Sequence, residues 1–469
     1  KSNIQQEENG YTINHFIIAP PATKENMPSV PNPFNGKLID KKRFDSGGNE
    51  VYSISYEYDS VMNNVYYGFK PTLEEYVGTC MRYQLVSSSV NLEKTTEYFR
   101  DNTGNKYNEK IKEYSYNDYN MLKTLTENTS FDDKEILTSN VYVADIENPT
   151  GVYDDMQSEN VISPLKSTTR IIIANSATAV TQKHEFDYEL GHSITIPDDG
   201  TTFNAYNNHK ITQYPSGDIS ATIETDIAYD DKGNILHVDP SNDLPVSYIW
   251  GYAQTKPIAR FINANTFETG YTGFEHAEGN GWSKEHLIVE DSEAHSGRYV
   301  AKVGLNNSTD QYGPTGLFNI DDFDSEFDDF IVSVFVKSFS TSPYLRIQFN
   351  EDYSTSETVH CLGTGVWEVL QIEIKKEDIE PYTGTGGYIK VYVGNNSNSD
   401  CYFDDIAFKP AYSDLTTYTY AHLRGVTSKT ASDHTTIYYE YDEFGRLKLL
   451  RDTDGNILEE YEYNYQPQP

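Results

Sequence analysis

Residues 438–465 read YYEYDEFGRLKLLRDTDGNILEEYEYNY. Large apolar and polar side chains alternate on both sides of two Asp-x-x-Gly steps, Asp442–Gly445 and Asp452–Gly455. Alternation with a period of two is typical of a half-buried strand. The Asp can bond the backbone that follows it and the Gly can take a positive φ, so each step predicts a hairpin turn, a type I turn closed by a glycine bulge. A lone hairpin is marginal in water, so we expect further copies to stack on it.

Copies of this step occur elsewhere in the chain. Three more Asp-x-x-Gly steps, each followed by Asn as in Asp452–Gly455, are Asp45–Gly48, Asp101–Gly104 and Asp230–Gly233. A Tyr-x-Tyr pair also recurs, at 56–58, 114–116, 439–441 and 461–463. Irregular repetition at roughly 20 residues indicates an array in which each unit buries a face against its neighbour. These aspartates and glycines are therefore interpreted as structural turns.

The pattern YxYDxxGRLxxxxDxxGN resembles the tyrosine-aspartate (YD) repeat of the Rhs family of bacterial secreted and surface proteins and toxin shells. The match is specific at 438–465, weaker at 226–252 and degenerate before residue 130. The segment DLPVSYIWGYAQTKPIARFINA (243–264) is similar to one common in Rhs-type surface proteins of Gram-negative bacteria. The resemblance implies long β-sheets, partly spiralled, that serve as a scaffold.

Composition favours an all-β fold and excludes some partners. The 469 residues suggest about two or three domains, and 39 Tyr with 30 Gly against 5 Met favour strands and turns. The formal charge is 36 − 72 = −36, which repels nucleic acid, so we expect no nucleic-acid partner. No apolar run reaches the ~18 residues of a membrane-spanning helix, so none is expected. The start lacks Met and a signal-type apolar core, so the chain is expected to begin within a larger product or after a processing site.

Changes in composition and in the repeat pattern along the chain predict four segments. A proline-punctuated linker or extended segment covers 1–34, and a degenerate repeat region covers 35–262. Residues 263–410 lose the repeat and contain about eight short strand-like runs separated by Gly, Asn, Asp and Ser, which predicts a β-sandwich. The repeat pattern returns over 411–469, which predicts further hairpins there. Whether the two repeat segments join in one sheet around the insert stays open at this point.

The insert resembles the jelly-roll carbohydrate-binding modules. The landmarks are Phe267-Glu268, Trp282 after glycines, HSGRYVAKV (295–303), a strand around Trp367 and a closing YFDDI (402–406). The resemblance implies one structural Ca²⁺ held by an early Glu, carbonyls and a closing Asp, which correspond here to Glu268 and Asp405. The alternative is an ordinary surface Glu and a turn Asp.

Sugar binding requires aromatic faces and amide or carboxylate partners. The candidate aromatic residues are Tyr271, Trp282, Tyr312 and Tyr344, with Gln311, Asn306 and Asn307 close to Tyr312 in sequence. Each has the alternative of being a packing residue. Cys361 and Cys401 fall in the same domain and either pair in an oxidising compartment or remain buried free thiols.

The sequence contains no GxSxG, no HExxH and no phosphate-binding glycine loop. We therefore expect no enzyme activity, and predict a secreted or cell-surface scaffold or adhesion protein, at the outer-membrane exterior, whose sandwich contacts glycan or a surface protein. The alternatives are a fragment of a toxin-encasing shell, cargo or a subunit of an outer-membrane secretion assembly, and an accessory module of a carbohydrate-active enzyme.

Overall fold

The computed structural model describes residues 2–7, 10–18, 32–74, 77–101, 103–130, 134–174, 177–195, 202–215, 222–283, 288–290, 294–304, 312–324 and 327–463. Strands account for 61% and helices for 7%, which confirms the all-β prediction. Two compact units divide the chain, Lys1–Tyr188 with Ile211–Ile223, and Glu189–Lys210 with Glu224–Pro469. No helix of the described residues is long and apolar enough to cross a membrane.

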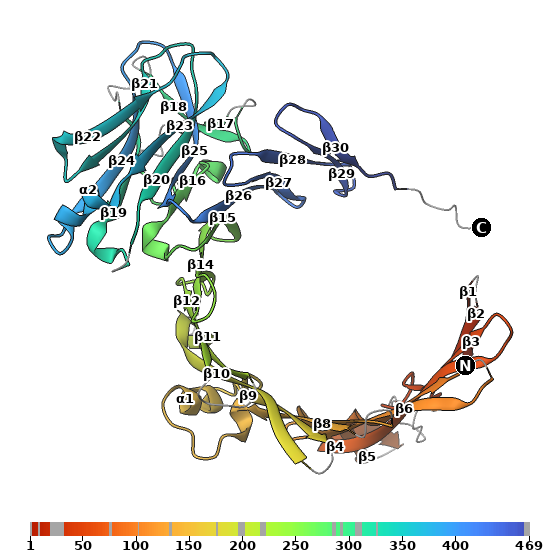
Figure 1. Ribbon diagram of the computed structural model, residues 1–469. Helices are drawn as coiled ribbons and strands as arrows, with labels where there is room; N and C mark the ends of the chain where they lie inside the picture. The colour runs from red at the N-terminus through yellow and green to blue at the C-terminus, as the bar shows by residue number, and fades with distance from the viewer. Residues whose placement is uncertain are drawn as a thin grey trace. The chain divides into compact units, whose positions relative to one another are not determined.

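Unit 1 is an antiparallel meander in which each strand pairs with the next along the chain. Helix α1 (Val152–Ser158) and the 3₁₀ turn η1 (Val143–Asp145) lie between β8 and β9, where Met156 and Val143 are fully buried. The strands are β1 (Ser2–Glu7), β2 (Gly10–Phe16), β3 (Leu38–Asp45), β4 (Glu50–Glu74), β5 (Val77–Arg100), β6 (Lys106–Tyr116), β7 (Leu122–Thr129), β8 (Lys134–Tyr142), β9 (Leu165–Ala174), the first part of β10 (Ala177–Thr195) and the last part of β11 (Thr202–Pro215) (Figure 1).

Of the two alternatives over 1–34, a linker or an extended segment, the start of the chain follows the second. Residues 2–7 and 10–16 form β1 and β2, which pair with each other, and β2 also pairs with β3. Tyr11 stacks on Phe44 of β3 with ring centroids 4.7 Å apart. A strand that pairs on both sides satisfies its backbone groups and gains cross-strand contacts, which outweighed the polar composition of the segment. The proline-rich run 19–31 lies outside the described residues.

The five Asp-x-x-Gly steps adopt one turn geometry. In each, the Gly N–H donates to the Asp carbonyl at 2.9–3.1 Å, and Oδ1 of the Asp accepts the N–H four residues on at 2.8–2.9 Å. The glycine φ values are 76° to 82°, a region that costs other residues energy. The strand register shifts by one residue beside each turn, as a glycine bulge requires. The predicted hairpin turns are confirmed.

Five tyrosines in or beside the hairpin strands, of which Tyr229 and Tyr441 directly precede one of these turns, share a role that sequence reasoning did not assign. The hydroxyl of each donates to a backbone carbonyl on the preceding strand or just beside it, which ties neighbouring strands through a side chain. The pairs are Tyr58 to Leu38, Tyr116 to Leu92, Tyr229 to Asn208, Tyr441 to Val426 and Tyr463 to Leu447, at 2.7–3.0 Å. Tyrosine thus supplies a half-buried ring and a hydrogen bond at the same position.

Unit 2 contains two hairpin segments that are joined edge to edge. The first comprises β12 (Ile223–Tyr229), β13 (Ile235–Pro240), β14 (Val246–Gly251) and β15 (Lys256–Ile262), and the second comprises β26 (Asp414–Ala421), β27 (Gly425–Thr430), β28 (Thr436–Tyr441), β29 (Leu447–Arg451) and β30 (Ile457–Glu460). Strand β15 pairs antiparallel with β26, with Ile262 opposite Asp414 (Figure 1). The sandwich therefore occupies the loop of one hairpin, and repeat strands from before and after it share a sheet.

The inserted domain is a sandwich of two antiparallel sheets. One has the order β17–β18–β25–β20–β23 with β16 also on β25, and the other has the order β19–β24–β21–β22. The strands are β16 (Gly270–Thr272), β17 (Ile288–Glu290), β18 (Tyr299–Val303), β19 (Tyr312–Asn319), β20 (Phe330–Lys337), β21 (Pro343–Phe349), β22 (Asp352–His360), β23 (Trp367–Ile374), β24 (Tyr388–Asn395) and β25 (Cys401–Pro410), with short helices η3 (Thr266–Glu268), η4 (Glu275–Ala277), η6 (Ile320–Asp322), α2 (Lys376–Ile379) and η7 (Glu380–Tyr382).

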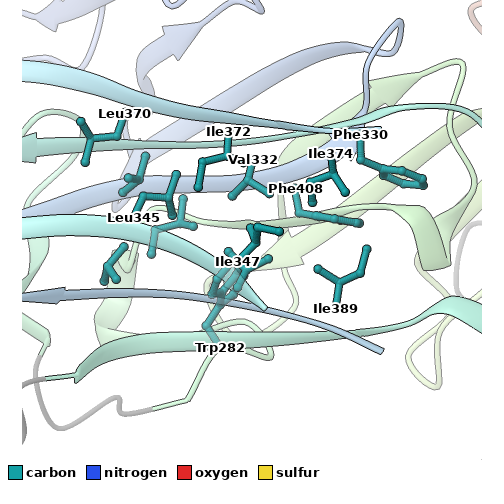
Figure 2. Packing of buried hydrophobic residues seen from close by; sticks show 14 of the residues in the cluster. Trp282, Phe330, Val332, Leu345, Ile347, Leu370, Ile372, Ile374, Ile389 and Phe408 are labelled. Carbon is teal, nitrogen blue, oxygen red and sulfur yellow. The ribbon is translucent and has the colours of Figure 1, made fainter. Parts of the chain in front are cut away.

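The core of the sandwich lies between its two sheets. Figure 2 shows Leu345 and Ile347 of one sheet facing Val332 and Ile372 of the other, and each of these residues is at most 3% exposed. The period-two patterns of β20, β21 and β23 supply these side chains. Cys361 and Cys401 are buried in the same core as free thiols, so the disulfide alternative is wrong for this pair. Each Sγ instead donates to a backbone carbonyl.

The sandwich is fastened to the hairpins by a second, smaller core. Tyr271 and Ala407 of the sandwich pack against Ile258, Phe261 and Leu415 of β15 and β26. Polar bonds reinforce this contact, since Tyr438 of β28 donates its hydroxyl to the carbonyl of His295 at 2.8 Å. The insert and the adjoining hairpins are thus one packed body.

Candidate functional site

The four-stranded sheet β19–β24–β21–β22 presents polar and aromatic side chains on the side away from the core. In β21, Leu345, Ile347 and Phe349 enter the core, so the alternate residues Tyr344 and Arg346 lie on the other side. Tyr392 of β24 lies on this side for the same reason, between the core residues Val391 and Val393. We call the group Tyr312, Tyr344, Arg346, Tyr353 and Tyr392 the tyrosine–arginine face.

Arg346 is the centre of this face. Its Nε donates to Oγ1 of Thr358 at 2.6 Å, and its Nη1 donates to the hydroxyls of Tyr353 and, at 3.4 Å, Tyr392. Its guanidinium carbon lies 4.7 Å from the ring centroid of Tyr344 and 5.0 Å from that of Tyr353. A guanidinium carries five N–H donors, and within the described residues these bonds leave both Nη2 hydrogens without a hydrogen-bond acceptor.

The charge of Arg346 has no counter-ion among the described residues. Its neighbours are phenols, and burial raises the pKa of Tyr344 and Tyr392, so both stay neutral at physiological pH. Tyr312 and Tyr353 are 43% and 60% exposed, which leaves part of the Tyr353 ring in contact with solvent beside the cation and part of the Tyr312 ring in contact with solvent beside Tyr392. Exposed ring faces on one sheet that also carries free N–H donors can hold a flat, hydroxylated ligand.

The structure places two of the predicted aromatic residues on this face. Tyr312 is exposed at one side, with its ring 5.8 Å from that of Tyr392. Tyr344 is only 1% exposed and lies beside Arg346 and His360, so it supports the face from within and presents no free ring surface. Gln311, Asn306 and Asn307 lie outside the described residues.

Sequence reasoning missed Arg346, Tyr353 and Tyr392. The alternation in PYLRIQF and in YIKVYVG does assign Arg346 and Tyr392 to the side of their strands that faces away from the apolar residues. What it does not give is the pairing of β21 between β22 and β24, which brings these side chains together.

The other predicted aromatic residues are packing residues. Tyr271 is 2% exposed in the smaller core, and its hydroxyl donates to Asp405. Trp282 is 4% exposed in the sandwich core, edge to face with Phe318. One side of Trp282 also lines a recess of about 570 Å³ beside Phe267, which is 65% exposed. The prediction of an exposed sugar contact is therefore wrong for Tyr271. For Trp282, the side that lines this recess is the part that a sugar could reach.

The two predicted calcium ligands do not meet. Glu268 accepts the N–H groups of Asn265 and Asp324 in a recess that also contains Pro410. Asp405 lies five residues back along β25, roughly 17 Å in an extended strand, and accepts bonds from Tyr271, His295 and Ser296. The prediction that Glu268 and Asp405 share one calcium site is therefore wrong. Binding of calcium elsewhere in the domain stays a prediction, tested by comparing melting temperatures with calcium and with a chelator.

Fold and face together define an all-β protein in which hairpins carry a two-sheet sandwich with an aromatic, cationic face. No protein-family model matches the chain, and no curated protein matches it. Among solved structures, it is similar to the CBM22-1 xylan-binding domain of Paenibacillus barcinonensis Xyn10C, with 15% identity over 30% of this chain and 92% of that domain and a TM-score of 0.22.

Two further solved structures are similar to the chain. SGBP-B, from a complex xyloglucan utilization locus of Bacteroides uniformis, has 11% identity over 53% of this chain and 82% of that chain, with a TM-score of 0.21. The Tc holotoxin pore of Photorhabdus luminescens has 11% identity over 97% of this chain and a TM-score of 0.20, and the chain spans 19% of its length. At such scores these matches define no family and no ligand. The Rhs resemblance stays a prediction.

Proposed function

We propose that this chain is a non-enzymatic, secreted or cell-surface β scaffold whose sandwich binds glycan on the tyrosine–arginine face. The observation that carries the proposal is Arg346, a guanidinium with no counter-ion among the described residues. It lies beside the partly exposed ring of Tyr353, and Tyr392 separates it from the partly exposed ring of Tyr312. The rings offer apolar surface to the C–H face of a pyranose, and the free Nη2 hydrogens offer donors to its hydroxyls.

The geometry of the supporting residues favours a preformed site. Tyr344 and Tyr392 are buried beneath Arg346, and Thr358 fixes its Nε, so little side-chain order has to be gained on binding. The hairpin sheet that continues from β15 to β26 serves in this proposal as the arm that presents the sandwich. A toxin-shell fragment and an enzyme accessory module remain the alternatives expected from the sequence.

A glycan array probed with the full chain tests the proposal, followed by calorimetry with the best ligand. We expect the double variant Tyr312→Ala/Tyr353→Ala to bind that ligand at least about tenfold more weakly, because two stacking surfaces are lost. Tyr119→Ala is the matched control, since Tyr119 is 55% exposed in unit 1. No binding to any glycan, or an equal loss in the control, would refute the proposal.

A further inference from the structure

A second cavity lies where the hairpins meet the sandwich. It has a volume of about 700 Å³, which falls within the ~300–1,000 Å³ typical of small-molecule sites. Its walls come from four places far apart in sequence: the β14–β15 turn, η4, the start of β18 and the β26–β27 turn. We call it the junction pocket. It shares no residue with the tyrosine–arginine face.

Three tyrosines form the apolar part of this pocket. Tyr252, Tyr299 and Tyr420 line it, and the rings of Tyr252 and Tyr420 meet edge to face at 5.5 Å. Hydrogen bonds hold two of them, because the hydroxyl of Tyr252 accepts the N–H of Tyr420 at 2.8 Å and that of Tyr420 donates to the carbonyl of Pro257 at 2.8 Å. The ring positions are therefore set before any ligand arrives.

The rim of the pocket is cationic in a chain whose formal charge is −36. Lys256, Arg298 and Arg424 line it, all exposed, and among the described residues of the lining Glu275 alone is acidic. Arg298 pairs with Glu290 outside the pocket. Within the described residues, Lys256 and Arg424 have no carboxylate partner, and the Nζ of Lys256 lies 5.9 Å from the ring centroid of Tyr420.

The carboxylate of Glu275 is directed into the protein. Glu275 is 7% exposed, and its Oε1 accepts the N–H groups of Arg298 and Tyr299 at 2.7 and 2.9 Å. Its Oε2 accepts the hydroxyl of Tyr252 at 3.2 Å. A Cβ at Gly297, where φ is +62°, would lie 2.2 Å from the Glu275 carboxyl carbon, so only glycine allows this seating. The carboxylate is thus occupied by protein donors, and the two rim cations are left for a ligand.

We infer that the junction pocket binds an acidic sugar, with the pyranose ring against the tyrosines and the carboxylate between Lys256 and Arg424. The tyrosines supply apolar surface for the ring, and the two unpaired cations supply charge-assisted hydrogen bonds for the anion. Neither a neutral sugar nor a small carboxylate uses both halves of the pocket. The chemistry therefore selects for the combination of ring and negative charge.

Calorimetric titration of the full chain with galacturonate tests this inference. Galactose, which has the ring without the charge, and acetate, which has the charge without the ring, are the comparison ligands. We expect saturable galacturonate binding, at least about tenfold weaker binding of both comparison ligands, and at least about tenfold weaker galacturonate binding by Lys256→Gln/Arg424→Gln. The matched charge control is Lys375→Gln/Lys448→Gln, two exposed lysines outside the pocket.

Lys256 and Arg424 are both exposed, so the double variant Lys256→Gln/Arg424→Gln is expected to keep the melting temperature of the parent chain. The variant Tyr312→Ala/Tyr353→Ala separates this site from the tyrosine–arginine face. Galacturonate binding retained there and lost in Lys256→Gln/Arg424→Gln supports the junction pocket. The inference is overturned by the reverse pattern, by the absence of saturable galacturonate binding, or by galactose binding as tightly as galacturonate.

Discussion

Nδ1 of His295 lies 2.7 Å from Oδ2 of Asp405, and the two side chains are 7% and 5% exposed. Asp405 also accepts the hydroxyls of Tyr271 at 2.5 Å and Ser296 at 2.9 Å. The neighbouring Asp404, with no exposed surface, accepts the N–H groups of His295 and Ser296. The YFDDI motif therefore supplies two buried acceptors that hold the segment just before β18 against β25, next to the contact with the hairpins.

Replacing Asp405 by Ala should destabilise unit 2 by roughly 3 kcal/mol or more, because three buried donors lose their acceptor. Urea unfolding followed by tryptophan fluorescence measures this, since Trp250, Trp282 and Trp367 all lie in unit 2. Asp405→Asn keeps one acceptor oxygen, and Asn tolerates the φ of +49° found here. The free energy of unfolding should therefore fall less in Asp405→Asn than in Asp405→Ala. Equal losses for the two variants would contradict this role.

The stability of unit 2 should fall as the pH rises from about 4.5 to about 7. Burial raises the pKa of Glu275 from 4.5 to about 7. The folded state thus binds this proton more tightly than the unfolded state, so the contribution is complete below pH ~4.5 and is lost by about pH 7, on the order of 3 kcal/mol. Burial, and then the charge of Asp405, also raises the pKa of Asp404, which acts in the same direction.

Glu275→Gln isolates the contribution of Glu275 to this dependence. The amide stays neutral, so the variant should show a flatter stability profile between pH 4.5 and 7 in the same fluorescence assay. Glu373→Gln, an exposed residue of β23, serves as the control and should keep the parent profile. A Glu275→Gln profile as steep as that of the parent would show that other groups dominate.

Tyr441→Phe should weaken the C-terminal hairpins by about 1 kcal/mol, because it removes the 2.7 Å bond to the Val426 carbonyl and keeps the ring. Amide hydrogen exchange is the direct measurement, with protection in β27 and β28 expected to fall about fivefold. Tyr107→Phe is the control, since Tyr107 is 62% exposed. Unchanged protection in Tyr441→Phe would mean that the hydroxyl contributes nothing to strand pairing.

Gly233→Ala should cost unit 2 about 1–2 kcal/mol, because its φ of +82° is unfavourable for any residue with a Cβ. Space is not the cause, since a Cβ there meets nothing within 4 Å. Asp230→Ala should cost about 1 kcal/mol through the loss of the bonds from Lys232 and Asn234. Urea unfolding of the two variants measures both losses of stability. A neutral Gly233→Ala would contradict the turn assignment.

The turns were predictable because their interactions are local. Asp230 and Asn234 are four residues apart, and every bond of the turn forms within that window. A related turn at Asn117–Asn120 escaped prediction, because Asn120 takes the glycine position with φ of +67°. Asn tolerates this region better than most residues. A search that accepts Asn as well as Asp at the first position and Asn as well as Gly at the fourth would have found it.

The candidate sites were predictable only in part. Tyr312 was identified as exposed and aromatic, but its relation to Arg346 depends on which strand lies beside β21. Glu268 and Asp405 were matched by order along the chain, and the strand length between them keeps them apart. The junction pocket combines residues from 252 to 425, so no single stretch of sequence contains it.

The sequence by itself determined the all-β class and the Asp–Gly hairpin turns, because alternation and Asp–Gly turns act over a few residues. Only the tertiary structure decided that β15 pairs with β26 across the insert, that Arg346 lies among tyrosines, and that Lys256 and Arg424 face one cavity. Strand pairing between distant segments is set by the packing of whole faces, and a local pattern carries no information about its partner.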